Sequence, residues 1–135
     1  MIDWKAVVRV LALTLLLEVV MIGLAFGWVA FYSYLIHPGE VEAYYSGYAQ
    51  VASPIVSLIA GPAVFGVMAR ILRSRGSGRS REVWIVLAAY LILDILVVLF
   101  AAEDVASNLL FWVPSGFTKA AGVWIGARFS RVRHA

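Results

Sequence analysis

Three ionisable residues, Glu18, Asp94 and Lys119, lie inside apolar stretches that are long enough to span a bilayer. A charged side chain at the centre of a transmembrane helix costs about 2.5–3.5 kcal/mol on insertion scales, and such residues mark ion pathways and proton relays. The chemistry that carboxyl and ammonium groups permit at this depth is the reversible binding of a proton or a cation. The positions of these groups depend on the helices that carry them.

Helix geometry places the three groups in a layer near the middle of the bilayer. At 1.5 Å per residue, Glu18 and Lys119 lie about 13 Å from the basic ends of their segments, and Asp94 about 19 Å. Side chains tilt towards the N-terminus of a helix, so Asp94 and Lys119 converge if their helices are antiparallel neighbours. We therefore expect an Asp94–Lys119 ion pair. This pair leaves Glu18 without a cation, and an unpaired acid in hydrocarbon is expected to be protonated.

Hydroxyl groups accompany the charges. Thr14 is one helical turn from Glu18, Tyr90 is one turn from Asp94, and Ser57 has a similar depth. The residues expected to bind an ion or a proton are Glu18, Asp94, Lys119, Thr14, Ser57 and Tyr90. The alternative interpretation is that the charges only fix helix packing, as buried ion pairs can do.

The composition indicates the class of protein. The chain has 63% hydrophobic and 14% charged residues, and its mean hydropathy is +0.91. A soluble domain of 135 residues would need more polar groups to cover its surface. A membrane-spanning helix needs roughly 20 mostly apolar residues, and four segments qualify, at about 7–34, 51–69, 83–102 and 106–127. We expect one domain over residues 1–135, an all-α transmembrane bundle of four helices with an Arg-rich loop at 70–82.

Basic residues are concentrated on one side of this arrangement. They precede the first segment, fill the 70–82 loop and follow the last segment, whereas the other two connections contain no Lys or Arg. By the positive-inside rule both termini and the Arg-rich loop are cytoplasmic, which predicts a multi-pass protein of the plasma or inner membrane. We expect the loop to contact anionic lipid rather than nucleic acid, through Arg73, Arg75, Arg79 and Arg81.

Small residues recur four apart in three of the segments and predict close helix packing. The motifs are Gly23-xxx-Gly27, Ser53-xxx-Ser57-xxx-Gly61 and Thr118-xxx-Gly122-xxx-Gly126. Three such faces are more than one small bundle needs, so we expect a homo-oligomer. The Gly61-Pro62 step is the strongest candidate for a kink or local unwinding, because proline removes a backbone donor.

The stretch LLLEVV, with Glu18 in the first of four short helices, resembles the first helix of small multidrug resistance transporters. The resemblance implies a membrane glutamate that binds protons and cationic drugs in exchange. It covers about one helix. Members of that family are shorter, lack a counterpart of Asp94 and Lys119, and have a glycine-rich third helix that residues 83–102 do not reproduce.

The function expected from these residues is that of a proton- or cation-coupled transporter or channel that uses an intramembrane acid. The alternative is a non-catalytic membrane scaffold or accessory subunit. An enzyme is not favoured, because the apolar segments contain no histidine and their serines have no evident base. The chain has no cysteine, and we expect neither a metal site nor a cofactor.

Overall fold

Four long helices make up nearly all of the part of the chain that the computed structural model describes, residues 3–76, 79–101 and 105–129. The elements are α1 (Trp4–Phe31), a short π-helix η1 (Tyr32–Ile36), α2 (Glu42–Ser74), α3 (Ser80–Ala101) and α4 (Val105–Phe129). The all-α, four-helix architecture expected from the sequence is confirmed.

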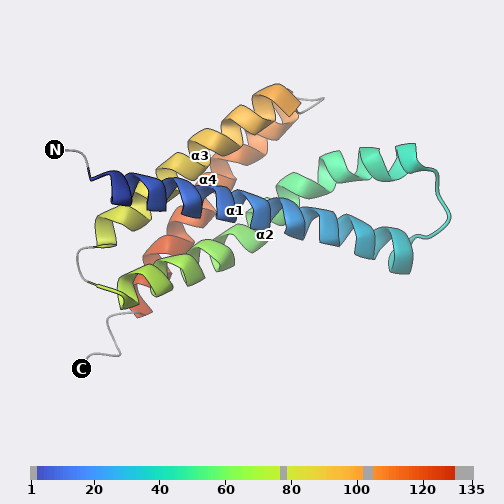
Figure 1. Cartoon of the computed structure of the whole chain (residues 1–135). Coiled ribbons are helices and arrows are strands. Elements are labelled where there is room, and N and C mark those ends of the chain that lie inside the picture. Colours follow the sequence, from blue (N-terminus) through green and yellow to red (C-terminus); the bar gives the residue numbers. More distant parts are fainter. Residues whose placement is uncertain (1–2, 77–78, 102–104, 130–135) are drawn as a thin grey trace.

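The helices form two antiparallel hairpins, α1–α2 and α3–α4 (Figure 1). All four come together at one end, where α1 and α3 begin and α2 and α4 end. We call it the basic end, because the first turn of α1 and the last turns of α2 and α4 carry Lys5, Arg73 and Arg128 there. At the opposite end, called the hairpin end, the two hairpins diverge (Figure 1). Because each hairpin turns back on itself, α2 runs parallel to α4 and α1 runs parallel to α3.

Polar side chains stabilise the helix termini at the basic end. The Asp3 carboxylate caps α1 by accepting hydrogen bonds from the backbone N–H groups of Lys5 (3.1 Å) and Ala6 (3.4 Å). Arg73, in the last turn of α2, donates a hydrogen bond to the carbonyl oxygen of Ala127 (3.1 Å), near the end of α4. This contact ties the last turns of the two parallel helices together.

The helices extend well beyond the apolar stretches from which they were expected. The second helix begins at Glu42 rather than near residue 51, and it ends at Ser74 rather than near 69. Most of the expected 70–82 loop is therefore helical, and only residues 75–79 connect α2 to α3. The physical reason is that hydropathy measures the apolar length of a segment, whereas arginine is a good helix former that continues a helix past the apolar stretch.

Of the kink or local unwinding expected at Gly61-Pro62, the unwinding does not occur, because α2 is helical through both Pro54 and Pro62. Pro62 has no N–H group to donate to the carbonyl oxygen of Leu58, one helical turn earlier. The hydroxyl of Thr118 on α4 lies 3.3 Å from that oxygen and 3.0 Å from the carbonyl oxygen of Ser115 on its own helix, and it shares its one proton between them. A side chain of the neighbouring helix thus partly replaces the missing intrahelical hydrogen bond.

Glycines bring α2 and α4 into backbone contact, and these two helices form the most extensive helix pair in the bundle. A Cβ atom on Gly122 would overlap the carbonyl oxygen of Pro62, and one on Gly126 would overlap that of Gly66. The small-residue faces of these helices therefore meet within one chain. Added Cβ atoms at Gly23 and Gly27 of α1 would meet no atom within 4 Å, so the third face is free of such contact.

Large apolar side chains cover the outside of the bundle. Phe26 is 76% exposed and Phe100 is 87% exposed, and exposed Leu, Ile and Val residues follow all four helices. Three helical stretches among the described residues are long and apolar enough to cross a membrane, namely Trp4–Ile36, Glu42–Ser74 and Ser80–Phe100. The fourth helix is less apolar because it carries Lys119 and several hydroxyl and glycine residues. This surface suits hydrocarbon and supports a membrane location.

Candidate functional site

The ammonium group of Lys119 lies at the centre of the bundle. Its side chain projects from α4 and has no solvent exposure. The Nζ atom donates a hydrogen bond to Ser57 Oγ on α2 (2.8 Å) and another to Ser115 Oγ, one turn earlier on α4. The two serine oxygens are themselves 3.2 Å apart, and Nζ lies 5.3 Å from the centre of the Tyr90 ring. Neutral oxygens and an aromatic face therefore surround the buried charge.

The expected direct ion pair between Asp94 and Lys119 is not formed. Within the described part of the chain, ion pairs of 4.0 Å or less join Arg9 to Glu82, Arg79 to Glu82 and His37 to Glu40. Asp94 interacts with Lys119 electrostatically over a longer distance. The physical reason is that Ser115 lies one helical turn from Lys119, so its oxygen meets the ammonium group before the carboxylate can.

Glu18 of α1 faces the same layer and lacks a full set of hydrogen bonds. Glu18 is only 8% exposed, and its Oε2 atom has no hydrogen-bond partner among the described residues. The carboxyl group interacts with the Tyr90 hydroxyl, with Asp94 and with Lys119. Buried polar atoms of native proteins are nearly always satisfied, so an open carboxyl oxygen in this position needs an explanation.

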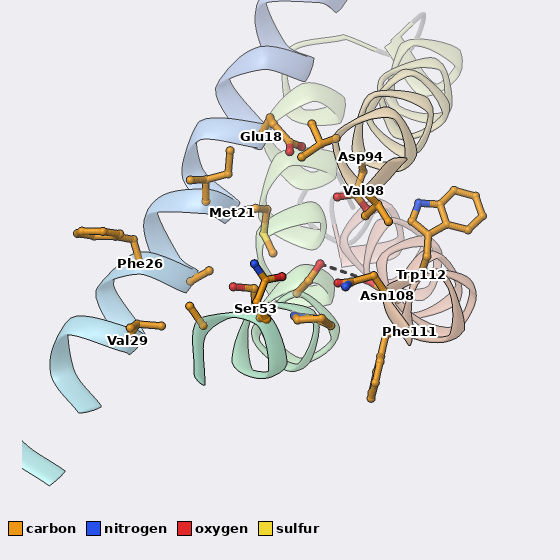
Figure 2. Close-up of a pocket in the computed structure, with 18 of the residues that line it drawn as sticks. Glu18, Met21, Phe26, Val29, Ser53, Asp94, Val98, Asn108, Phe111 and Trp112 are labelled. Carbon is orange, nitrogen blue, oxygen red and sulfur yellow. Dashed lines mark hydrogen bonds between the residues drawn. The ribbon is translucent and has the colours of Figure 1, made fainter. Parts of the chain in front are cut away.

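Glu18 borders a cavity of about 510 Å³ (Figure 2). Its polar floor consists of Glu18, Ser57, Tyr90, Asp94 and Ser115. From this floor the cavity extends towards the hairpin end, between residues 18–29 of α1, 42–57 of α2, 90–98 of α3 and 108–115 of α4. Figure 2 shows Glu18 and Asp94 at one end of the cavity, with apolar side chains along its sides.

The opposite side of the polar layer is closely packed. The buried apolar core lies mostly between this layer and the basic end, and Phe65, Val86 and Val123 within it have no exposure. The Phe65 ring meets the Tyr90 ring edge to face, with the centres 4.8 Å apart. Nearer the basic end, Arg9 of α1 pairs with the half-buried Glu82 of α3 (2.8 Å). The polar layer therefore separates an open half of the bundle from a packed half.

The structure brings together most of the residues that the sequence singled out. The cavity is lined by Glu18, Ser57, Tyr90 and Asp94. Lys119 lies directly beneath it and is hydrogen-bonded to the two serines. Thr14 is buried but lies one turn towards the basic end, outside the cavity lining, with its hydroxyl unpaired among the described residues.

Sequence reasoning missed one member of this site, Ser115. Its distance of four residues from Lys119 places the two side chains on one helix face and was the available signal. Sequence reasoning also missed Ser53 and Asn108, which line the cavity above the floor (Figure 2). Asn108 is an amide side chain with interactions of its own.

Chemically, this arrangement can hold one small positive charge. Two carboxyl groups and a tyrosine hydroxyl offer oxygen ligands, and the fixed ammonium group of Lys119 offsets part of their negative charge. Within the described residues, no three His, Cys, Asp or Glu side chains cluster as ligands of a metal ion usually do. A proton or a monovalent cation is the ligand that suits two carboxyl groups beside a fixed cation.

Comparisons with protein-family models, with curated proteins and with solved structures found no match for this chain.

Proposed function

We propose that the protein is a small transporter or channel of four transmembrane helices, in which Glu18 and Asp94 bind a proton or a monovalent cation at the floor of the cavity. The cavity provides access to the carboxyl groups from the hairpin end. The packed core on the other side of the floor keeps the two sides of the membrane separate in this conformation. Transport then requires the core residues of the basic half to move apart.

The single observation that carries this proposal is the position of Glu18. Its buried Oε2 atom has no hydrogen-bond partner among the described residues, and the side chain borders an open cavity. An acid that served only to hold helices together would be expected to have its oxygens paired, since an unsatisfied buried polar group costs about 1–3 kcal/mol. A binding carboxyl group, in contrast, must keep an oxygen free for its ligand.

We also propose that the basic end faces the cytoplasm and that the cavity opens on the other side. The distribution of Lys and Arg along the sequence favours this orientation in a plasma or inner membrane. The exposed side chains of Arg75 and Arg81 are the main expected contacts with anionic lipid. Arg73 instead binds the Ala127 carbonyl oxygen, and Arg79 lies 3.9 Å from Glu82. Reporter fusions after Arg75 and after Glu42 test this orientation, since activity of a periplasmic reporter at Arg75 would reverse it.

A homo-oligomer remains part of the proposal. Gly23 and Gly27 line an apolar groove of about 690 Å³ between α1 and α2. Small residues let helices in lipid approach each other closely. The face formed by Gly23 and Gly27 makes no such close contact with another helix of the same chain. A second copy of α1 is the occupant that we propose for the groove.

The proposed function is tested by measuring flux with purified protein in liposomes. Protons, sodium or potassium ions, and a cationic dye are each offered under an imposed gradient of pH or membrane potential. We expect flux of at least one of these that depends on the protein and on pH. If no gradient drives any flux, the transport proposal fails, and the alternative of a scaffold whose charges fix helix packing takes its place.

A further inference from the structure

The two hairpins resemble each other in sequence as well as in form. Residues 10–20, VLALTLLLEVV, align with residues 86–96, VLAAYLILDIL, at an offset of 76, with five of eleven positions identical. This alignment pairs Glu18 with Asp94. A second pair of segments also matches in sequence: residues 69–75, ARILRSR, align with 127–133, ARFSRVR, at an offset of 58, with four of seven positions identical. The offsets differ mainly because α3 and α4 are shorter than α1 and α2 towards the hairpin end.

Two contacts between α2 and α4 join residues at the same offset of 58, and the close backbone approaches of Gly122 to Pro62 and of Gly126 to Gly66 lie within two residues of it. Ser57 and Ser115 are equivalent positions in the alignment, and their hydroxyl oxygens touch at 3.2 Å. Gly61 and Lys119 are also equivalent, and a Cβ atom at Gly61 would lie 2.9 Å from Lys119 Cγ. Equivalent residues of two parallel helices meet in this way when an approximate two-fold axis runs between the helices. The axis passes through the pair of serines that holds the ammonium group.

The equivalent acids, Glu18 and Asp94, both line the floor of the cavity around this axis (Figure 2). Among other differences, the symmetry of the polar layer is broken where α4 carries Lys119 and α2 carries Gly61, and where α3 carries Tyr90 and α1 carries Thr14. The charged and titratable groups that face the floor are Glu18 from α1, Tyr90 and Asp94 from α3 and Lys119 from α4. Helix α2 contributes Glu42 and Tyr45, both towards the hairpin end of the cavity.

We propose that the chain is an internal duplication of a two-helix hairpin, that Glu18 and Asp94 are equivalent halves of one cation site, and that Lys119 is the resident counter-cation of this site. With both acids ionised the floor carries one net negative charge, which matches one exchangeable proton or monovalent cation. This ligand class rests on the proposed function, whereas the symmetric arrangement does not depend on it.

Moving the lysine across the axis tests the proposal. A lysine at position 61 would have Ser57 one turn earlier on its own helix, as Lys119 has Ser115, and would face Ser115 across the axis. The variants are Lys119→Gly, Gly61→Lys and the combination of both. We expect each single change to lower the unfolding temperature in detergent, the first because the site loses its cation and the second because Lys119 occupies the space. The combination should recover most of the loss.

A matched control moves the lysine to a glycine that lies off the axis. Gly47 has open space around it, so Gly47→Lys with Lys119→Gly adds the same side chain elsewhere and should recover nothing. A relocated variant that unfolds at the temperature of Lys119→Gly, or that does not fold, overturns the symmetric site. So does equal recovery by the control.

Flux measured in the same variants separates this inference from the proposed function. If the wild-type protein transports, the relocated variant should retain transport and Lys119→Gly should lose it. Loss of transport in a relocated variant that has recovered its stability contradicts the role of Lys119 as the counter-cation of the site. If the wild-type protein does not transport but the relocation restores stability, the cation-transport proposal fails while the duplicated site stands.

Discussion

Replacing Gly122 by alanine should weaken the bundle at the contact that positions Lys119. The new Cβ atom would overlap the carbonyl oxygen of Pro62, which is backbone and cannot rotate away. The helices α2 and α4 must therefore separate along the stretch that includes the two serines. Overpacking of a close contact costs about 1–3 kcal/mol, and a glycine-to-alanine change in a helix returns about 1 kcal/mol. Because the obstacle is backbone, we expect a net loss of about 1–2 kcal/mol.

Gly47→Ala is the matched control for this change. Gly47 also lies within α2, but an added Cβ atom would meet no atom within 4 Å. Only the gain in helix propensity applies there, so Gly47→Ala should stabilise by up to about 1 kcal/mol. The two variants should differ by about 1–3 kcal/mol, and a difference of about 2 kcal/mol is roughly a 30-fold change in the unfolding equilibrium. Unfolding in mixed detergent micelles, followed by circular dichroism, measures both. Equal stability of the two variants would refute the close packing of α2 against α4.

Two further changes test other parts of the account. Thr118→Val removes the hydroxyl that donates to the Leu58 carbonyl oxygen, which lacks a proline N–H. We expect a loss of about 1 kcal/mol of stability in the same unfolding assay. An unchanged stability would show that this hydrogen bond contributes nothing. Gly23→Cys introduces a single thiol into a chain without cysteine, and oxidation in native membranes should give a disulfide-linked dimer. A cysteine at the exposed Phe117 on α4 should crosslink less, and the opposite ranking would remove the α1 groove as the interface.

The fold was largely predictable because apolar length is a strong signal for membrane-spanning helices. The ends of the helices were less predictable, since the polar and aromatic residues 42–50 continue α2 without contributing apolar length. The positions of Glu18 and Asp94 along their helices could be read from the sequence alone. The hydrogen-bond partners of Lys119 could not be predicted in this way, because the position along a helix does not say in which direction around the helix a side chain points. The oxygens of Ser115, one turn earlier on the same helix, and of Ser57, on the neighbouring helix, compete with the carboxylate for the ammonium group.

The predicted close-packing motifs had different outcomes for a similar reason. A small-residue motif shows that a helix face permits close approach, but it does not identify the partner. The Gly122-xxx-Gly126 face meets α2 of the same chain, whereas Gly23 and Gly27 have no such neighbour. The approximate symmetry between the hairpins depends on the register of α2 against α4, which only the structure supplies.

The central claim is that Glu18 binds the transported proton or cation, and the most direct test compares Glu18→Gln with Glu42→Gln in liposomes. Both changes remove one carboxylate while keeping shape and hydrogen bonding; Glu18 is at the floor of the cavity and Glu42 is at its exposed mouth. We predict that both proteins fold with nearly wild-type thermal stability, that Glu42→Gln keeps its pH-dependent flux, and that Glu18→Gln loses it. Undiminished pH-dependent flux in a folded Glu18→Gln protein would contradict the account.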